Sequence, residues 1–118
     1  MSEKIPVDFS QLKKTVGENR TLFLKLGNNA LQEYPAKIAE IRAALAQRDA
    51  AAVARIAHAL KGSFAGIGAE EARGVAYAVE LKGKDNALTE AAPMVEELAA
   101  AVGRLCDFFS SPAWIERV

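Results

Sequence analysis

Cysteine and histidine are scarce in this sequence, and their scarcity excludes several kinds of site. Among 118 residues there is one cysteine, Cys106, and one histidine, His58. A single cysteine cannot form an intrachain disulfide, and the Cys and His spacing of a zinc site is absent. A lone histidine also lacks the companions that a closed metal site needs. We therefore expect no metal and no cofactor in this chain, and we expect Cys106 to be a core thiol, with a redox role as the alternative.

Net charge and long apolar runs are missing as well. Fifteen basic residues balance fifteen acidic ones, so no overall positive field attracts nucleic acid or an anionic membrane. No stretch approaches the roughly 20 apolar residues of a membrane span, and Met1 to Pro6 lack the apolar core of a signal peptide. We expect a soluble, cytoplasmic monomer that recognises its partners through a local surface.

Proline and glycine are few, and alternating runs of Val, Ile and Thr are missing, whereas Ala, Leu, Glu, Lys and Arg are abundant. This composition favours helix over strand, and the length fits a single domain over residues 1–118. Helical patterns run from Asp8 to Gly17, from Asn19 to Leu45, from Asp49 to the glycines at 66 and 68, from Ala69 towards Gly83, and, after the turn segment KGKDN, as far as Ser110. The sequence therefore predicts an all-α protein, an antiparallel four-helix bundle with a short additional N-terminal helix.

Apolar spacing assigns an inward face to each long helix. The predicted core residues outside the histidine helix are Leu31, Tyr34, Ile38, Ile41 and Leu45, then Ala72, Val75, Ala76 and Val79, and finally Met94, Val95, Leu98, Val102, Leu105 and Phe109. Pro35 interrupts the first of these stretches, because it removes a backbone hydrogen bond and clashes with the preceding turn. We expect a kink or a brief break near Tyr34.

His58 lies on the outer side of its helix. A helix advances about 100° per residue, and on that count the apolar side chains gather within about 40° of one direction, whereas His58 points about 150° away from it. The apolar set comprises Val53, Ile56, Ala57, Leu60, Phe64 and Ile67. A core histidine is therefore disfavoured, and the remaining structural alternative is a passive surface residue.

The surroundings of His58 favour a functional role over a passive one. Its neighbours Ala54, Gly62 and Ala65 are small, and a glycine inside a helix costs roughly 1 kcal/mol relative to alanine, so Gly62 needs an offsetting benefit. Without a Cβ at Gly62, the backbone of another protein can come close to the imidazole. Lys61, three residues after His58, carries an ammonium that suits a phosphoryl group on the ring, although solubility is the ordinary role of a helix lysine. Arg55 is a second positive charge, and its ordinary role is solvation.

Histidine chemistry fits a relay of phosphoryl groups. A neutral imidazole is a nucleophile near physiological pH, and its phosphoramidate stays reactive enough to pass the group onward. Phosphoryl transfer also needs positioning and charge neutralisation, usually with metal ions. The sequence holds no GxxxxGK[ST] loop and no acidic cluster for magnesium. We therefore expect the remaining machinery for phosphoryl transfer to come from a partner.

The segment HALKGSFAGIGA, from His58 to Ala69, resembles the signature of the histidine-phosphotransfer (HPt) family, H-x-x-K-G followed by small residues, an aliphatic residue and Gly. The similarity covers roughly Asp8 to Phe109. The sequence departs from the family at Ala59, where a hydroxyl residue is frequent, and at Phe64 and Gly66, which replace a small residue and an asparagine. Ser63 matches the family, but its direction on the helix predicts local backbone bonding rather than contact with phosphate.

The resemblance implies a four-helix bundle with an exposed active histidine. It also implies a phosphoryl carrier that has no ATP-dependent kinase activity of its own and serves as a substrate for its partners' active sites, and it assigns roles to several residues. His58 would accept a phosphoryl group from a phospho-aspartate on the receiver domain of a hybrid sensor kinase and deliver it to a response regulator, with magnesium on the partner receiver. Lys61 would support the phosphate, Gly62 would leave room for the receiver, and Gly68 would belong to the turn that ends the helix.

Two alternatives to the phosphoryl carrier remain open. In the first, the chain is a helical adaptor that docks receivers or other signalling proteins without carrying phosphate. In the second, His58 is the general base of a hydrolase, although no Ser, Cys or carboxylate is evidently arranged with it.

Overall fold

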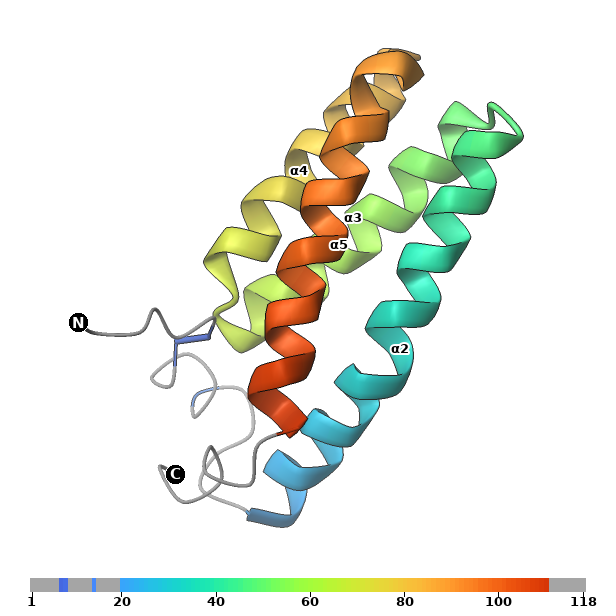
Figure 1. Ribbon diagram of the computed structural model, residues 1–118. Coiled ribbons are helices and arrows are strands. Elements are labelled where there is room, and N and C mark those ends of the chain that lie inside the picture. The colour runs from blue at the N-terminus through green and yellow to red at the C-terminus, as the bar shows by residue number, and fades with distance from the viewer. Residues whose placement is uncertain (1–6, 9–13, 15–19, 111–118) are drawn as a thin grey trace, which may run out of the picture.

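The computed structural model describes residues 7–8, 14 and 20–110. Over these residues the chain forms four helices and no strand: α2 (Arg20–Ala46), α3 (Ala50–Ile67), α4 (Glu70–Lys84) and α5 (Leu88–Ser110). Short turns join them, so consecutive helices run antiparallel, and α5 closes the ring by packing on α2 (Figure 1). The predicted all-α bundle is confirmed. The predicted N-terminal helix from Asp8 to Gly17 falls almost entirely outside the described residues.

The core lies between the four inward faces. All six residues predicted to face inward on α3 are buried. On the other helices most of the prediction also holds, but Leu31, Leu45, Val75 and Met94 are only partly buried, and small side chains such as Ala30 and Ala44 take central positions. Phe64 of α3 meets Tyr34 of α2 edge to face, with 4.9 Å between ring centroids. This pair joins the histidine helix to α2.

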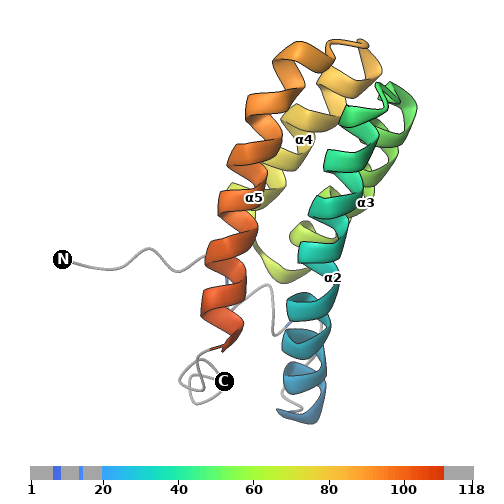
Figure 2. The same cartoon turned by 45° about the vertical axis from the view of Figure 1, so that its right-hand side comes forward.

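α2 continues through Pro35 as an unbroken helix, so of the two predicted outcomes the break does not occur. A proline inside a helix costs about 3 kcal/mol or more. Burial of Tyr34 and Ile38 on either side of Pro35, on the same core-facing stripe, offsets that cost. The first turns of α2 project past the end of α5, as both views show (Figure 2).

Both ends of α3 are fixed by local hydrogen bonds. The Asp49 carboxylate accepts the backbone N–H of Ala52 at 3.1 Å, which confirms Asp49 as the N-cap. Gly68 ends the helix in the left-handed region, with φ of 71°, and its N–H donates to the carbonyl of Ala65. The Gly68 carbonyl in turn accepts the N–H of Asp8 at 3.0 Å. These caps set the length of α3 and leave His58 midway along it.

Candidate functional site around His58

The His58 side chain is 66% exposed, as the direction of the residue on the helix predicts. Its ring is nevertheless held in place from one side. The Nδ1 atom lies 2.9 Å from Oε2 of Glu80, a residue of the neighbouring helix α4. In the neutral imidazole Nδ1–H donates to this carboxylate, which leaves Nε2 with a free lone pair. The ring therefore presents a nucleophilic nitrogen to solvent.

Glu80 is the functional residue that sequence reasoning missed. It is 1% exposed and is the one charged residue that is fully buried in the described part of the chain. The expectation that no carboxylate is arranged with His58 is therefore wrong. A signal was present, because Glu80 follows Ala72 and Ala76 at helical spacing and so falls on the inward stripe of α4, where a charge needs an explanation.

Two lysines compensate the buried carboxylate. Lys61 Nζ lies 2.7 Å from Oε1 of Glu80, and Lys84 Nζ lies 3.1 Å from Oε2. The hydrogen bond from Lys61 contributes most to lowering the pKa of Glu80 from 4.5 to about 2, and the bonds from Lys84 and His58 add to it, whereas burial acts in the opposite direction. Glu80 is therefore ionised at neutral pH and remains an acceptor for the imidazole.

Lys61 lies on the α4 side of the histidine helix. Its side chain is only 25% exposed, and its ammonium is 4.9 Å from the centroid of the Tyr77 ring, in addition to its contact with Glu80. The sequence placed this lysine on the surface beside His58, and the structure directs its charge towards α4. Lys84, which the sequence did not single out, supplies a second ammonium at the same carboxylate and is more exposed.

The surface next to His58 is open at Gly62, where an added Cβ would meet no atom within 4 Å. Gly83, one turn away from Glu80 on α4, has a different role from Gly62. A Cβ on Gly83 would lie 2.8 Å from the backbone nitrogen of Ala54 on α3. The close approach of the two helices at Gly83 and Ala54 lets the carboxylate of α4 reach the imidazole of α3.

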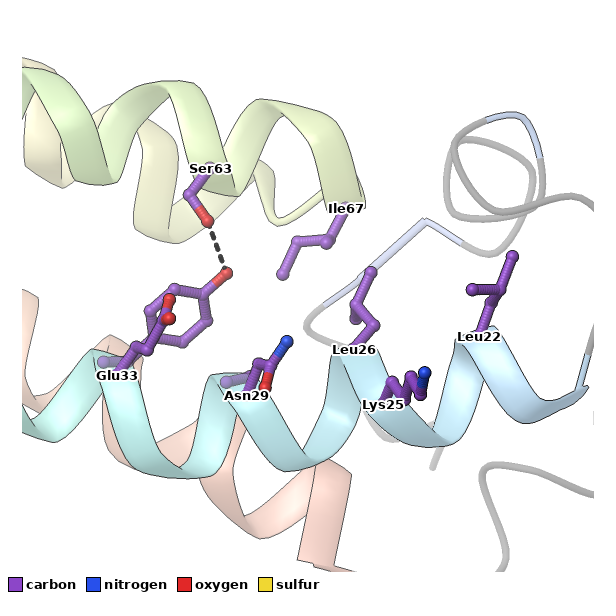
Figure 3. A pocket seen from close by; sticks show the side chains of 9 residues that line it. Leu22, Lys25, Leu26, Asn29, Glu33, Ser63 and Ile67 are labelled. Carbon is purple, nitrogen blue, oxygen red and sulfur yellow. Dashed lines mark hydrogen bonds between the residues drawn. The ribbon is translucent and has the colours of Figure 1, made fainter.

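Ser63 faces away from the histidine site. Its hydroxyl lies 2.8 Å from the hydroxyl of Tyr34, so the prediction of local backbone bonding is wrong (Figure 3). The pair borders a groove between α2 and α3. The groove is lined by Leu22, Lys25, Leu26, Asn29, Ala30, Glu33, Tyr34, Ser63 and Ile67. His58 does not line this groove, so its imidazole acts at an open surface and not in that hollow.

Three further findings concern the described residues. They contain no group of three or more His, Cys, Asp and Glu side chains that could hold a metal ion. None of their helices has the length and apolar character needed to cross a membrane. Cys106 is partly buried against the core, and burial raises the pKa of its thiol, which disfavours the reactive thiolate.

Comparison with known proteins identifies the family and the fold of the chain. The sequence profile of the family described as the Hpt domain matches residues 28–108. No curated protein sequence matches the chain significantly. The fold is similar to the crystal structure of histidine-containing phosphotransfer protein B (HptB) from Pseudomonas aeruginosa PAO1, with a TM-score of 0.86, 19% identity, and coverage of 98% of this chain and 99% of that one. The profile match spans more than half of the sequence, and the chain therefore belongs to the Hpt domain family.

Proposed function

We propose that His58 accepts a phosphoryl group from the phospho-aspartate of a receiver domain in a hybrid sensor kinase and transfers it to the receiver domain of a response regulator. Membership of the Hpt family gives the chain a histidine-phosphotransfer role in two-component signalling. The observation that carries the assignment to His58 is the exposed imidazole whose Nδ1 is held by an ionised, buried carboxylate. This arrangement leaves Nε2 as the reacting atom.

The transfer step follows from the contacts of the ring. The Nε2 lone pair attacks phosphorus, an N–P bond forms, and the bond between phosphorus and the aspartyl oxygen breaks, so the carboxylate of the partner leaves. The imidazole gains positive charge as the N–P bond forms, and the Glu80 carboxylate at Nδ1 stabilises that charge and fixes the tautomer. Glu80 is thus a positioning residue. The return step runs through the same atoms in reverse order.

Lys61 and Lys84 supply positive charge beside the reacting nitrogen. Two ammonium groups share one carboxylate, so one of their charges is not compensated within the site. A phosphoryl group on Nε2 brings negative oxygens to this neighbourhood, where a nearby ammonium stabilises them. We assign phosphate support to Lys61, which stands one turn from His58 on the same helix, and access for the partner to the open surface at Gly62.

In this proposal the chain is a carrier, and the partner completes the active site for phosphoryl transfer. Charge neutralisation at the transferring phosphorus usually requires a divalent ion and several polar groups. The proposal places magnesium on the partner receiver. It treats residues 1–118 as one Hpt domain that brings the histidine and its supporting charges to that site.

Labelling with a phosphorylated receiver tests the proposal. Purified receiver domains from the same cell, phosphorylated with a radioactive label, are incubated with the wild-type protein and with His58→Gln. We expect acid-labile, base-stable label on the wild type and none on the variant, because glutamine has no nucleophilic ring nitrogen. Absence of such label from the wild type, or equal labelling of the variant, contradicts the proposal. An adaptor that carries no phosphate predicts that His58→Gln retains full activity in cells.

A further inference from the structure

Two exposed apolar side chains lie on α4 next to the histidine site. Among the described residues the large exposed apolar side chains are Leu22, Leu24, Tyr77 and Leu81, and Tyr77 and Leu81 stand one turn apart on α4, with 46% and 41% exposure. A single exposed leucine needs no explanation, but an apolar pair beside a reacting group does. This pair does not contribute to the core of the bundle.

Short contacts connect the pair to His58. The imidazole contacts Glu80 at 2.9 Å, Glu80 contacts Lys61 at 2.7 Å, and the Lys61 ammonium lies 4.9 Å from the Tyr77 ring centroid. Leu81 directly follows Glu80 in the chain and is one helical turn from Tyr77. Tyr77 and Leu81 therefore border the same surface as the reacting nitrogen.

The usual size of a protein interface indicates whether a partner that reaches His58 also covers Tyr77 and Leu81. A specific interface of standard size covers about 800 Å² on each partner, a patch roughly 30 Å across. Any domain that brings an aspartyl phosphate to Nε2 of His58 with such an interface must cover the neighbouring side chains as well. The Tyr77 ring is connected to His58 through only two intervening side chains, so it falls within such a patch.

The charges around the pair match a partner with an acidic site. Lys61 and Lys84 face one shared carboxylate, Glu80, which is itself buried. The surface thus combines two apolar side chains with an excess of one positive charge, next to the open backbone at Gly62. An apolar centre beside complementary charge is the usual composition of a docking site.

We propose that Tyr77 and Leu81, with Lys61 and Lys84 beside them, form the α4 part of the surface on which the phosphorylated receiver domain docks. The proposal rests on the function proposed above. It assigns partner recognition to α4, in addition to the histidine helix. The Lys61 ammonium also lies over the ring of Tyr77. A receiver that docks onto Tyr77 is therefore next to the lysine that supports the phosphate.

The test compares two phosphoryl donors on the same variants. Leu81→Ala is assayed with a phosphorylated receiver that labels the wild type, and with phosphoramidate, a small donor that needs no docking surface. We expect KM for the receiver to rise about tenfold, as for the loss of an apolar interface contact, and the rate with phosphoramidate to stay within twofold of the wild type. Alanine suits a helix, so the fold tolerates the change.

Two controls make the outcome decisive. Leu24→Ala changes a leucine of α2 that is also exposed and is expected to leave both rates unchanged. Leu81→Met keeps an apolar side chain of similar size and is expected to restore most of the affinity for the receiver. Unchanged receiver kinetics in Leu81→Ala, or an equal loss in Leu24→Ala, overturns the docking surface while the labelled wild type leaves the phosphotransfer function intact. Failure of the wild type to accept label from any receiver overturns the function itself.

Discussion

Glu80 shows how one residue organises the site. A buried carboxylate is costly unless it is paired, and here three cationic or donor groups, from Lys61, Lys84 and His58, share it. The contacts that hold the carboxylate ionised are the same contacts that orient the imidazole. The stability of the fold and the state of the reacting ring are therefore linked at this residue.

The pKa of Glu80 predicts a specific acid sensitivity. The value is about 2 in the folded protein against 4.5 ordinarily, so the stabilisation is complete above pH 4.5 and is lost as pH falls towards 2. Urea unfolding across this range should show a steeper loss of folding free energy in the wild type than in Glu80→Gln. Glu96→Gln, which removes an exposed carboxylate paired with Arg42, should stay close to the wild type. Parallel curves for wild type and Glu80→Gln would contradict the linkage.

A substitution at Gly62 should distinguish access for the receiver from the reactivity of His58. Because a Cβ at Gly62 meets no atom within 4 Å beyond its own stretch of helix and the site faces open space, Gly62→Gln should fold with equal or slightly higher stability, by up to about 1 kcal/mol. The longer side chain should obstruct a docking receiver, so transfer from the receiver should fall at least tenfold while labelling by phosphoramidate stays near the wild-type rate. A normal rate from the receiver would refute the role of Gly62 in access.

At this scale the sequence predicted part of the site. His58, Lys61 and Gly62 lie within five residues on one helix, where local spacing determines which side chains are neighbours. Glu80 lies 22 residues from His58 on another helix, and Lys84 lies further still. Which residues of α4 face α3 depends on how the two helices are packed, so motif spacing could not identify them.

The pairing of α3 with α4 depends on the glycine at position 83. A Cβ there would lie 2.8 Å from the backbone nitrogen of Ala54, and a backbone atom cannot move aside as a flexible side chain can. Gly83→Ala should therefore force the helices apart and lower stability by about 1–3 kcal/mol. It should also slow phosphoramidate labelling, because the contact between Glu80 and His58 loosens.

Gly103 of α5 provides the matched control for that change. A Cβ at Gly103 meets no atom within 4 Å, so Gly103→Ala should raise stability by up to about 1 kcal/mol through helix propensity alone. Thermal unfolding of the two variants gives the comparison. Equal stability of Gly83→Ala and Gly103→Ala would show that the close approach is not needed.

The ends of α3 and the continuity of α2 could be predicted from local sequence signals to different extents. The start and end of α3 were predictable, because Asp49 and Gly68 act through neighbouring backbone groups. The continuity of α2 across Pro35 was not, since it depends on tertiary burial of Tyr34 and Ile38 against other helices. The hydrogen bond between Ser63 and Tyr34 was missed for the same reason.

For the whole molecule, most of the apolar core lies apart from the histidine site, and Glu80 is where the two meet. The core between the four helices is made of buried apolar side chains, and the histidine site occupies the outer surface shared by α3 and α4. Composition and helical spacing were sufficient to predict this architecture, because amphipathic helices with short connections have few ways to bury their apolar faces. Composition and helical spacing could not predict how one helix packs against another, and that packing completes the site.

The nitrogen that carries the phosphoryl group tests the central claim most directly. After incubation with a phosphorylated receiver, the imidazole signals of ¹⁵N-labelled protein distinguish phosphorylation at Nε2 from phosphorylation at Nδ1. Because Glu80 holds Nδ1, we predict a single phosphohistidine with phosphorus on Nε2 of His58. Phosphate on Nδ1, or no phosphohistidine at all, would contradict the account.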